Sequence, residues 1–131
     1  MIAYGPQEEV HVISATIRGV PYPQQKRRGD LQAPKRWTDA VVEQTRHLPR
    51  VSEACFLKLT FLLPANKFPN DFPYGPDLDN LLKRTLDALR RTIFCDAKGG
   101  DSCVIAIVAM KTKVEREADA GAHLEILPVR L

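Results

Sequence analysis

The chain has 131 residues, of which 44% are hydrophobic and 27% are charged, and its formal net charge is +3. This length and composition indicate one globular domain with a modest core, and they argue against a disordered or fibrous protein. No apolar run approaches the roughly 18–20 residues of a membrane span. The first residues lack the basic-then-apolar order of a signal peptide, so we expect a cytoplasmic protein with no membrane partner.

The cysteines give the same indication. Cys55, Cys95 and Cys103 are odd in number and show no CxxC spacing. This pattern argues against a disulfide framework and against a zinc knuckle, and it favours a reducing compartment. We therefore expect all three thiols to serve packing rather than catalysis.

Residues 10–20 are rich in β-branched side chains and predict a first strand. Residues 24–37 form a polar stretch with Gly29 and Pro34, which predicts an irregular loop. Thr38 or Asp39 can cap a helix over roughly 38–47, which Pro49 closes. Residues 53–63 predict a second strand with Cys55, Leu57, Leu59, Phe61 and Leu63 on one face.

A long proline-rich loop, PANKFPNDFPYGP, leads to a second helix. Loops of this length inside a small domain are uncommon and often serve a site. The helix is predicted from one apolar stripe with three- and four-residue steps, made of Leu78, Leu81, Leu82, Leu86, Leu89 and Ile93.

The third strand, CVIAIVAM, is apolar on both faces, which predicts a central position covered on each side. The charged segment 111–122 predicts a turn, and HLEILPVRL predicts a last strand in which Pro128 favours an edge position or an early end. The order β-α-β-α-β-β predicts a single α+β domain, with a mixed sheet of about four strands packed with helices. Residues 1–9 are expected to be a loose segment.

The stretch PDLDNLLKRTLDAL, residues 76–89, can be interpreted in two ways. In the first, Asp77 or Asp79 caps the helix, and Asp79, Lys83 and Asp87 form surface ion pairs at four-residue steps. In the second, the carboxylates hold a metal. One aspartate is enough for a cap, and a second nearby carboxylate adds repulsion unless a cation or a proton relieves it.

A second acidic cluster, Asp96 and Asp101, precedes the third strand. The second helix separates it from Asp77, so a shared site requires the strand to pass beside the helix start. In that case Asp77, Asp79 and Asp101 would supply oxygen ligands suited to Mg²⁺ or Mn²⁺, with Asp96 as a further candidate. Such a metal activates water for phosphodiester hydrolysis, and Lys83 would neutralise charge in the transition state.

A cluster of cations lies before the first helix. It comprises Lys26, Arg27, Arg28, Lys35 and Arg36, with Trp37 next to it. One interpretation is a solvated surface loop. Its charge density and the neighbouring aromatic fit contact with DNA phosphates better, and Lys67, Arg84 and Lys111 could assist.

These motifs resemble those of the RusA-type Holliday-junction resolvases, small endonucleases of bacteria and their phages. The family's D-x-D-N-L-x-K run is matched by residues 77–83, a following D-A-L by residues 87–89, and an acidic run before a strand by Gly100-Asp101-Ser102-Cys103-Val104. The resemblance covers about residues 10–127. It implies that Asp77, Asp79 and Asp101 bind the metal and that Lys83 is the catalytic lysine.

The resemblance also implies a homodimer that nicks two strands of a four-way junction symmetrically during recombination and repair, in association with the nucleoid. One departure is important, because Gly100 replaces the first aspartate of the family's paired acids. Asp96 either supplies the missing carboxylate or is only a turn residue. A junction-binding protein that has lost cleavage is therefore an alternative, and a small interaction domain whose aspartates only cap a helix is another.

Overall fold

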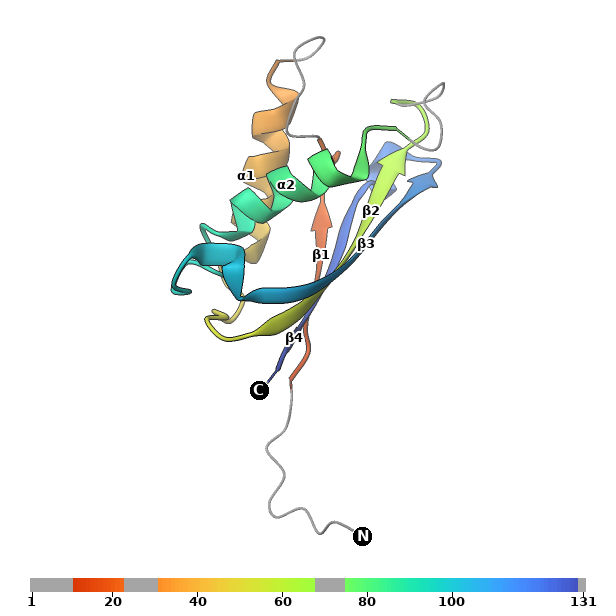
Figure 1. Cartoon of the computed structure of the whole chain (residues 1–131). Helices are drawn as coiled ribbons and strands as arrows, with labels where there is room; N and C mark the ends of the chain where they lie inside the picture. Colours follow the sequence, from red (N-terminus) through yellow and green to blue (C-terminus); the bar gives the residue numbers. More distant parts are fainter. Residues whose placement is uncertain (1–10, 23–30, 68–74, 130–131) are drawn as a thin grey trace, which may run out of the picture.

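The computed structural model describes residues 11–22, 31–67 and 75–129, and Figure 1 shows its arrangement. Two predictions fall outside these ranges. They concern the N-terminal segment, residues 1–9, and the cations Lys26, Arg27 and Arg28. The elements are β1 (Ile13–Arg18), α1 (Ala33–Thr45), β2 (Cys55–Pro64), α2 (Leu78–Leu89), the 3₁₀ turn η1 (Gly100–Cys103), β3 (Val104–Val114), η2 (Glu117–Asp119) and β4 (Gly121–Pro128). This order confirms the predicted α+β architecture with two helices and a four-stranded mixed sheet.

The four strands lie in the order β1-β4-β2-β3. β4 pairs antiparallel with both β1 and β2, whereas β3 pairs parallel with β2. The connection from β2 to β3 is therefore a crossover that contains α2. Both helices lie on the same side of the sheet (Figure 1). None of the helices in the described part of the chain has the length and apolarity needed to cross a membrane.

The core lies between the helices and this face of the sheet. The predicted inward face of β2 is confirmed, because Cys55, Leu57, Leu59, Phe61 and Leu63 are all buried. The stripe of α2 also packs inward, with Leu81, Leu89 and Ile93 buried and Leu78, Leu82 and Leu86 packed against the core. The indole Nε1 of Trp37 on α1 donates a 3.1 Å hydrogen bond to Thr85 Oγ1 on α2, which joins the two helices inside the core.

Helix α1 begins earlier than the predicted residue 38. Its first residue is Ala33, and Pro34 lies in the first turn, where its fixed φ suits a helix and its missing N–H removes no hydrogen bond. Lys35 and Arg36 are consequently helical residues and not part of an irregular loop. Trp37 is 1% exposed, so the prediction that it assists nucleic-acid contact at the surface is wrong.

The positions of two strands also differ from the predictions. β3 was expected in the middle of the sheet, but it is an edge strand whose apolar side chains are largely exposed. The sequence predicts an edge position or an early end for β4. It lies between β1 and β2, and it ends at Pro128, so only the early end is confirmed. The reason is the register, since β4 ends where it meets Cys55 at the start of β2.

Candidate metal centre at the start of helix α2

Asp77 and Asp79 stand at the start of α2, and both are exposed. Asp77 occupies the N-cap position with extended backbone angles, φ −60° and ψ 136°, yet its carboxylate makes no capping hydrogen bond. Asp79 lies in the first helical turn, where the helix dipole favours a negative charge. The N-cap position is therefore filled as predicted, but the capping interaction of the first interpretation is not formed.

The surface ion pairs of that interpretation are not formed either. Among the described residues, no oxygen of Asp79 or Asp87 lies within ion-pair distance of Lys83, and neither Asp77 nor Asp79 has a hydrogen-bond partner for its carboxylate. Two neighbouring carboxylates without hydrogen-bond partners repel each other, and a bound cation relieves that repulsion. Lys83 follows Asp79 by four residues, which places both side chains on one side of the helix.

Lys111 on β3 holds the residue immediately before this pair. Its Nζ donates a 2.8 Å hydrogen bond to the backbone carbonyl of Pro76, and the interaction is partly buried. The sequence suggested Lys111 only as an auxiliary DNA contact. Its place beside the helix start depends on the parallel pairing of β2 and β3, which sets Lys111 level with Phe61.

Asp101 lies at the opposite end of α2. It belongs to η1, and its carboxylate Oδ1 is 3.7 Å from Nε of Arg90, the C-cap residue of α2. Because α2 has 12 residues, its two ends are about 18 Å apart. A site shared by the three aspartates requires β3 to pass beside the start of α2. β3 does pass there, but the residue that it places beside the helix start is Lys111 and not Asp101. One chain therefore does not bring Asp101 together with Asp77 and Asp79.

The remaining acidic candidate, Asp96, follows the C-terminal end of α2 and so lies away from the start of that helix. It is exposed in the turn that follows α2, where the thiol of Cys95 lies 3.6 Å from its Oδ1. Within the described ranges, no three His, Cys, Asp or Glu side chains form a group that could hold a metal ion. The oxygen donors of Asp77 and Asp79 nevertheless fit Mg²⁺ or Mn²⁺, which bind through one or two carboxylates and retain several waters.

The cations that were predicted to contact DNA differ in their surroundings. Lys35 Nζ forms a 2.6 Å ion pair with Asp39 one turn later on α1, so part of its charge is neutralised locally. Arg84 donates a 3.2 Å hydrogen bond to Thr38 Oγ1 and joins α2 to α1. Lys67 pairs with Glu117 at 3.4 Å. Lys26, Arg27 and Arg28 lie outside the described residues.

Two of the three cysteines lie close to each other at the start of the β2–β3 pair. Burial, reinforced by the charge and hydrogen bond of the neighbouring Cys103, raises the pKa of the Cys55 thiol to about 12. A thiol with this pKa is protonated at neutral pH and is a poor nucleophile. The structure therefore supports packing as the role of Cys55.

No known family model matches this sequence, and no curated protein is significantly similar to it.

Proposed function

We propose that the protein is a Mg²⁺-dependent, structure-selective DNA endonuclease of the RusA type, which resolves four-way junctions in recombination and repair. The observation that carries the proposal is the exposed pair Asp77 and Asp79 at the start of α2, whose carboxylates have no side-chain partner among the described residues. Asn80 and Lys83 complete the motif on the same helix. Mn²⁺ would serve as a substitute metal because it accepts the same oxygen ligands.

Asp77 and Asp79 would hold the metal, whose contribution is to polarise the phosphodiester and to lower the pKa of bound water. The backbone N–H groups at the start of α2 point towards the same region and favour the anionic phosphate. Lys83 lies one turn inside the helix and would neutralise the charge that develops on the phosphate oxygens. The oxygen of water would bond to phosphorus as the bond to the leaving sugar oxygen breaks. The attacking water would lose a proton to solvent and the leaving oxygen would gain one, which leaves a phosphate and a hydroxyl that a ligase can rejoin.

A third carboxylate from Asp101 requires a second chain, because Asp101 lies at the far end of α2 from Asp77. The proposed homodimer offers this, since a two-fold axis can place one end of α2 near the opposite end of the partner's α2. The symmetry would also match that of a four-way junction. We propose that the protein acts in the cytoplasm, in association with the nucleoid.

The central experiment incubates the protein with a labelled four-way junction or a linear duplex, in Mg²⁺ or in EDTA. We expect paired nicks in the junction that require metal and that disappear in Asp79→Asn and Lys83→Ala. The matched control is Asp87→Asn, which removes an exposed carboxylate two turns further along the same helix. Tight junction binding without nicks would reject catalysis and leave the junction-binding alternative. The absence of affinity for either DNA would reject both.

Metal binding has a readout that does not depend on cleavage. A ligand that binds only the folded state stabilises it, by about 2.7 kcal/mol at a concentration of one hundred times its Kd. Mn²⁺ should therefore raise the melting temperature of the wild type and of Asp87→Asn, and it should have little effect on Asp77→Asn and Asp79→Asn. An equal shift in all four proteins would show that the metal binds elsewhere.

The basic cluster can be tested through the salt dependence of DNA binding. Neutralising Lys26, Arg27 and Arg28 together should lower the slope of log K against log salt by roughly three if all three contact phosphates. Lys35→Gln is the comparison, and we expect a smaller change because Lys35 already pairs with Asp39. An unchanged slope in the triple variant would reject this cluster as a phosphate contact.

A further inference from the structure

Cys55 and Cys103 are far apart in the sequence but lie together at the start of the β2–β3 pair. Cys55 is the first residue of β2 and is level with Val104, the first residue of β3. Cys103 ends η1, directly precedes Val104, and packs against the core that contains Cys55. The two side chains are close enough for a thiol–thiol hydrogen bond. Neighbouring strands are about 4.8 Å apart, so this pair lies within reach of a disulfide, which spans Cα separations of about 4.4–6.8 Å.

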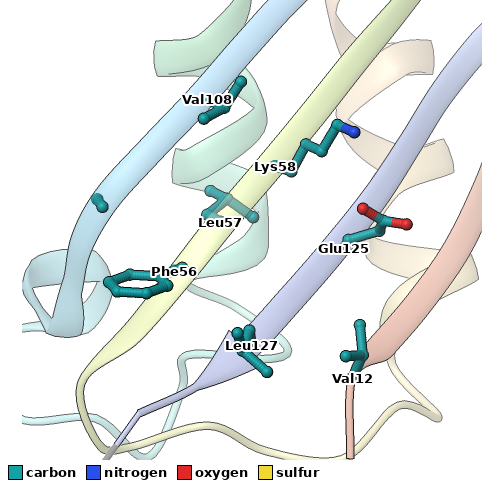
Figure 2. Close-up of a pocket in the computed structure, with 8 residues that line it drawn as sticks. Val12, Phe56, Leu57, Lys58, Val108, Glu125 and Leu127 are labelled. Atoms are coloured by element: carbon teal, nitrogen blue, oxygen red, sulfur yellow. The ribbon is translucent and has the colours of Figure 1, made fainter.

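The two thiols differ in their access to solvent. Cys55 is 0% exposed and lies on the inner face of β2, whereas Cys103 is half-buried. Phe56, the next residue, points to the opposite face of the sheet, where it lines an open hollow of about 320 Å³ (Figure 2). Cys55 is not among the described residues that line this hollow. A small oxidant that arrives from solvent therefore meets Cys103 first.

Contacts before and after Cys103 hold it in place. The hydroxyl of Ser102 donates a 3.1 Å hydrogen bond to the carbonyl of Lys98, and the carboxylate of Asp101 is 3.7 Å from Nε of Arg90. After Cys103 the chain enters β3, which pairs with β2. The turn η1 is therefore fixed relative to the start of β2. Two thiols held in contact in this way react with the advantage of an intramolecular reaction.

We propose that Cys55 and Cys103 form a reversible disulfide on exposure to hydrogen peroxide, and that this disulfide joins the start of β2 to η1. In the first step the Cys103 sulfur loses its proton and bonds to one oxygen of the peroxide, and the O–O bond breaks. The departing hydroxide takes up a proton and becomes water, which leaves a sulfenic acid on Cys103.

The second step uses Cys55 as the resolving thiol. Its sulfur bonds to the Cys103 sulfur, the S–O bond breaks, and the departing hydroxide takes the proton of Cys55 to form a second water. The two thiols together lose two electrons, and the peroxide gains them. Burial raises the pKa of the Cys55 thiol to about 12, so this thiol is protonated at neutral pH and is not the one that attacks peroxide.

The modification is compatible with a reducing compartment, because a dithiol restores both cysteines by exchange through a mixed disulfide. The disulfide would close a loop of about 50 residues that contains α2, which restricts the unfolded chain and stabilises the folded state. We expect the oxidised protein to melt roughly 10 °C higher than the reduced protein. The proposal rests on the two cysteines alone and does not depend on the proposed nuclease function.

The central experiment uses the full-length protein with Cys95→Ser, which removes the exposed third thiol. The protein is treated with hydrogen peroxide, free thiols are blocked with N-ethylmaleimide during unfolding in urea, and tryptic peptides are analysed without reduction. We expect the oxidised protein to be about 2 Da lighter, the mass of two hydrogens, and residues 51–58 to be joined to residues 99–111. Dithiothreitol should separate the peptides and lower the melting temperature again.

Two results of this experiment would overturn the proposal. One is a pair of thiols that remain free at peroxide concentrations that oxidise Cys95 of the wild type. The other is a Cys103 that gains two or three oxygens while Cys55 stays free, because the resolving step then does not take place.

A single-cysteine variant tests the order of the two steps. Cys103→Ser on the Cys95→Ser background leaves Cys55 alone, and circular dichroism checks that it remains folded. Peroxide should leave Cys55 unmodified in this variant because the thiol is buried, and the melting temperature should not change. Rapid oxidation of Cys55 would overturn the role of Cys103 as the attacking thiol.

The wild type with all three cysteines shows whether the fold selects the pair. In urea, Cys95 and Cys103 are separated by the shortest loop, so they should pair more often than Cys55 and Cys103. The folded protein should reverse this preference and give mainly the bond between Cys55 and Cys103. A folded wild type whose main product joins Cys95 to Cys103 would overturn the proposal.

Discussion

Lys111 on β3 donates a 2.8 Å hydrogen bond from Nζ to the backbone carbonyl of Pro76, the residue before the first aspartate of the candidate site. The bond joins an edge strand to the start of α2 across 35 residues of sequence. Pro76 directly precedes Asp77, whose carbonyl accepts the first helical hydrogen bond from Leu81 at 3.1 Å. The orientation of Asp77 and Asp79 therefore depends on β3 as well as on α2.

Lys111→Met keeps the aliphatic stem and removes this hydrogen bond. A hydrogen bond from a charged group contributes about 1.5–3 kcal/mol when buried, so we expect a loss of about 1 kcal/mol at this partly buried position. Amide hydrogen exchange should also accelerate at Leu81, in the first turn of α2. Lys98→Met serves as the control because Lys98 is an exposed lysine in the turn after α2. Equal exchange at Leu81 in both variants would show that the lysine does not hold the helix start.

Trp37 is the only tryptophan of the chain, so its fluorescence reports on a single place in the core. Thr85→Val should cost about 1–3 kcal/mol of the free energy of unfolding, because it leaves the buried indole N–H without its acceptor. Thr85→Ser retains the hydroxyl and should cost less. Four-way junction DNA should leave the emission maximum unchanged, since Trp37 is buried under α2. Strong quenching by DNA without unfolding would contradict the buried position.

The alternation of β2 and the stripe of α2 could be predicted from the sequence because each element buries one face against the same chain. The position of β3 in the sheet could not be predicted in this way. An apolar run indicates that a strand is covered on both sides, but it does not say whether the cover belongs to the same molecule.

The positions of the acidic residues could likewise be predicted only in part. The sequence places Asp77 and Asp79 at a helix start, since the local pattern of leucines determines where α2 begins. It does not determine where β3 crosses α2, because that depends on sheet order and on the parallel register with β2. The sequence can therefore group Asp101 with the helix start only on the condition that the third strand passes beside it there, whereas the fold places Asp101 beside Arg90 at the other end. The role of Lys111 was missed for the same reason.

The Cys55 thiol should make the stability of the protein depend on pH in the alkaline range. Its pKa is raised from 9.0 to about 12 in the folded state, mainly by burial and to a smaller extent by the neighbouring Cys103. The unfolded chain releases this proton at lower pH than the folded chain does, so the contribution is fully present below pH 9 and is lost as the pH rises from 9 towards 12. The slope approaches about 1.4 kcal/mol per pH unit within that window.

Urea denaturation at pH 8 and at pH 10 measures this contribution. Tyrosines and lysines also titrate in the range, so the informative quantity is the difference between the wild type and Cys55→Ala. We expect the wild type to lose more stability than Cys55→Ala between the two pH values. Identical losses would show that the thiol titrates normally. In thiol labelling at pH 8, exposed Cys95 should react well before Cys55.

In the proposed resemblance to the RusA-type resolvases, Gly100 takes the place of the first aspartate of an acidic pair, and the local backbone explains why glycine suits this chain. Gly99 and Gly100 have φ of +81° and +66°, a left-handed conformation that costs other residues roughly 1–2 kcal/mol. A Cβ at Gly100 would also lie 2.6 Å from Nε of Arg90, so the Arg90 side chain would have to move. Arg90 is the same residue that pairs with Asp101.

Gly100→Asp would create the acidic pair that the proposed resemblance expects, and it tests whether the proposed metal site lacks a ligand. We expect a loss of about 1 kcal/mol in urea denaturation, and a larger loss for Gly100→Ala, because aspartate tolerates the left-handed region better than alanine does. The new carboxylate lies against the Arg90 guanidinium and competes with Asp101 for it, so the rate of junction cleavage should not rise. A Gly100→Asp variant that cleaves several-fold faster than the wild type, with its stability unchanged, would show instead that the missing aspartate limits the site.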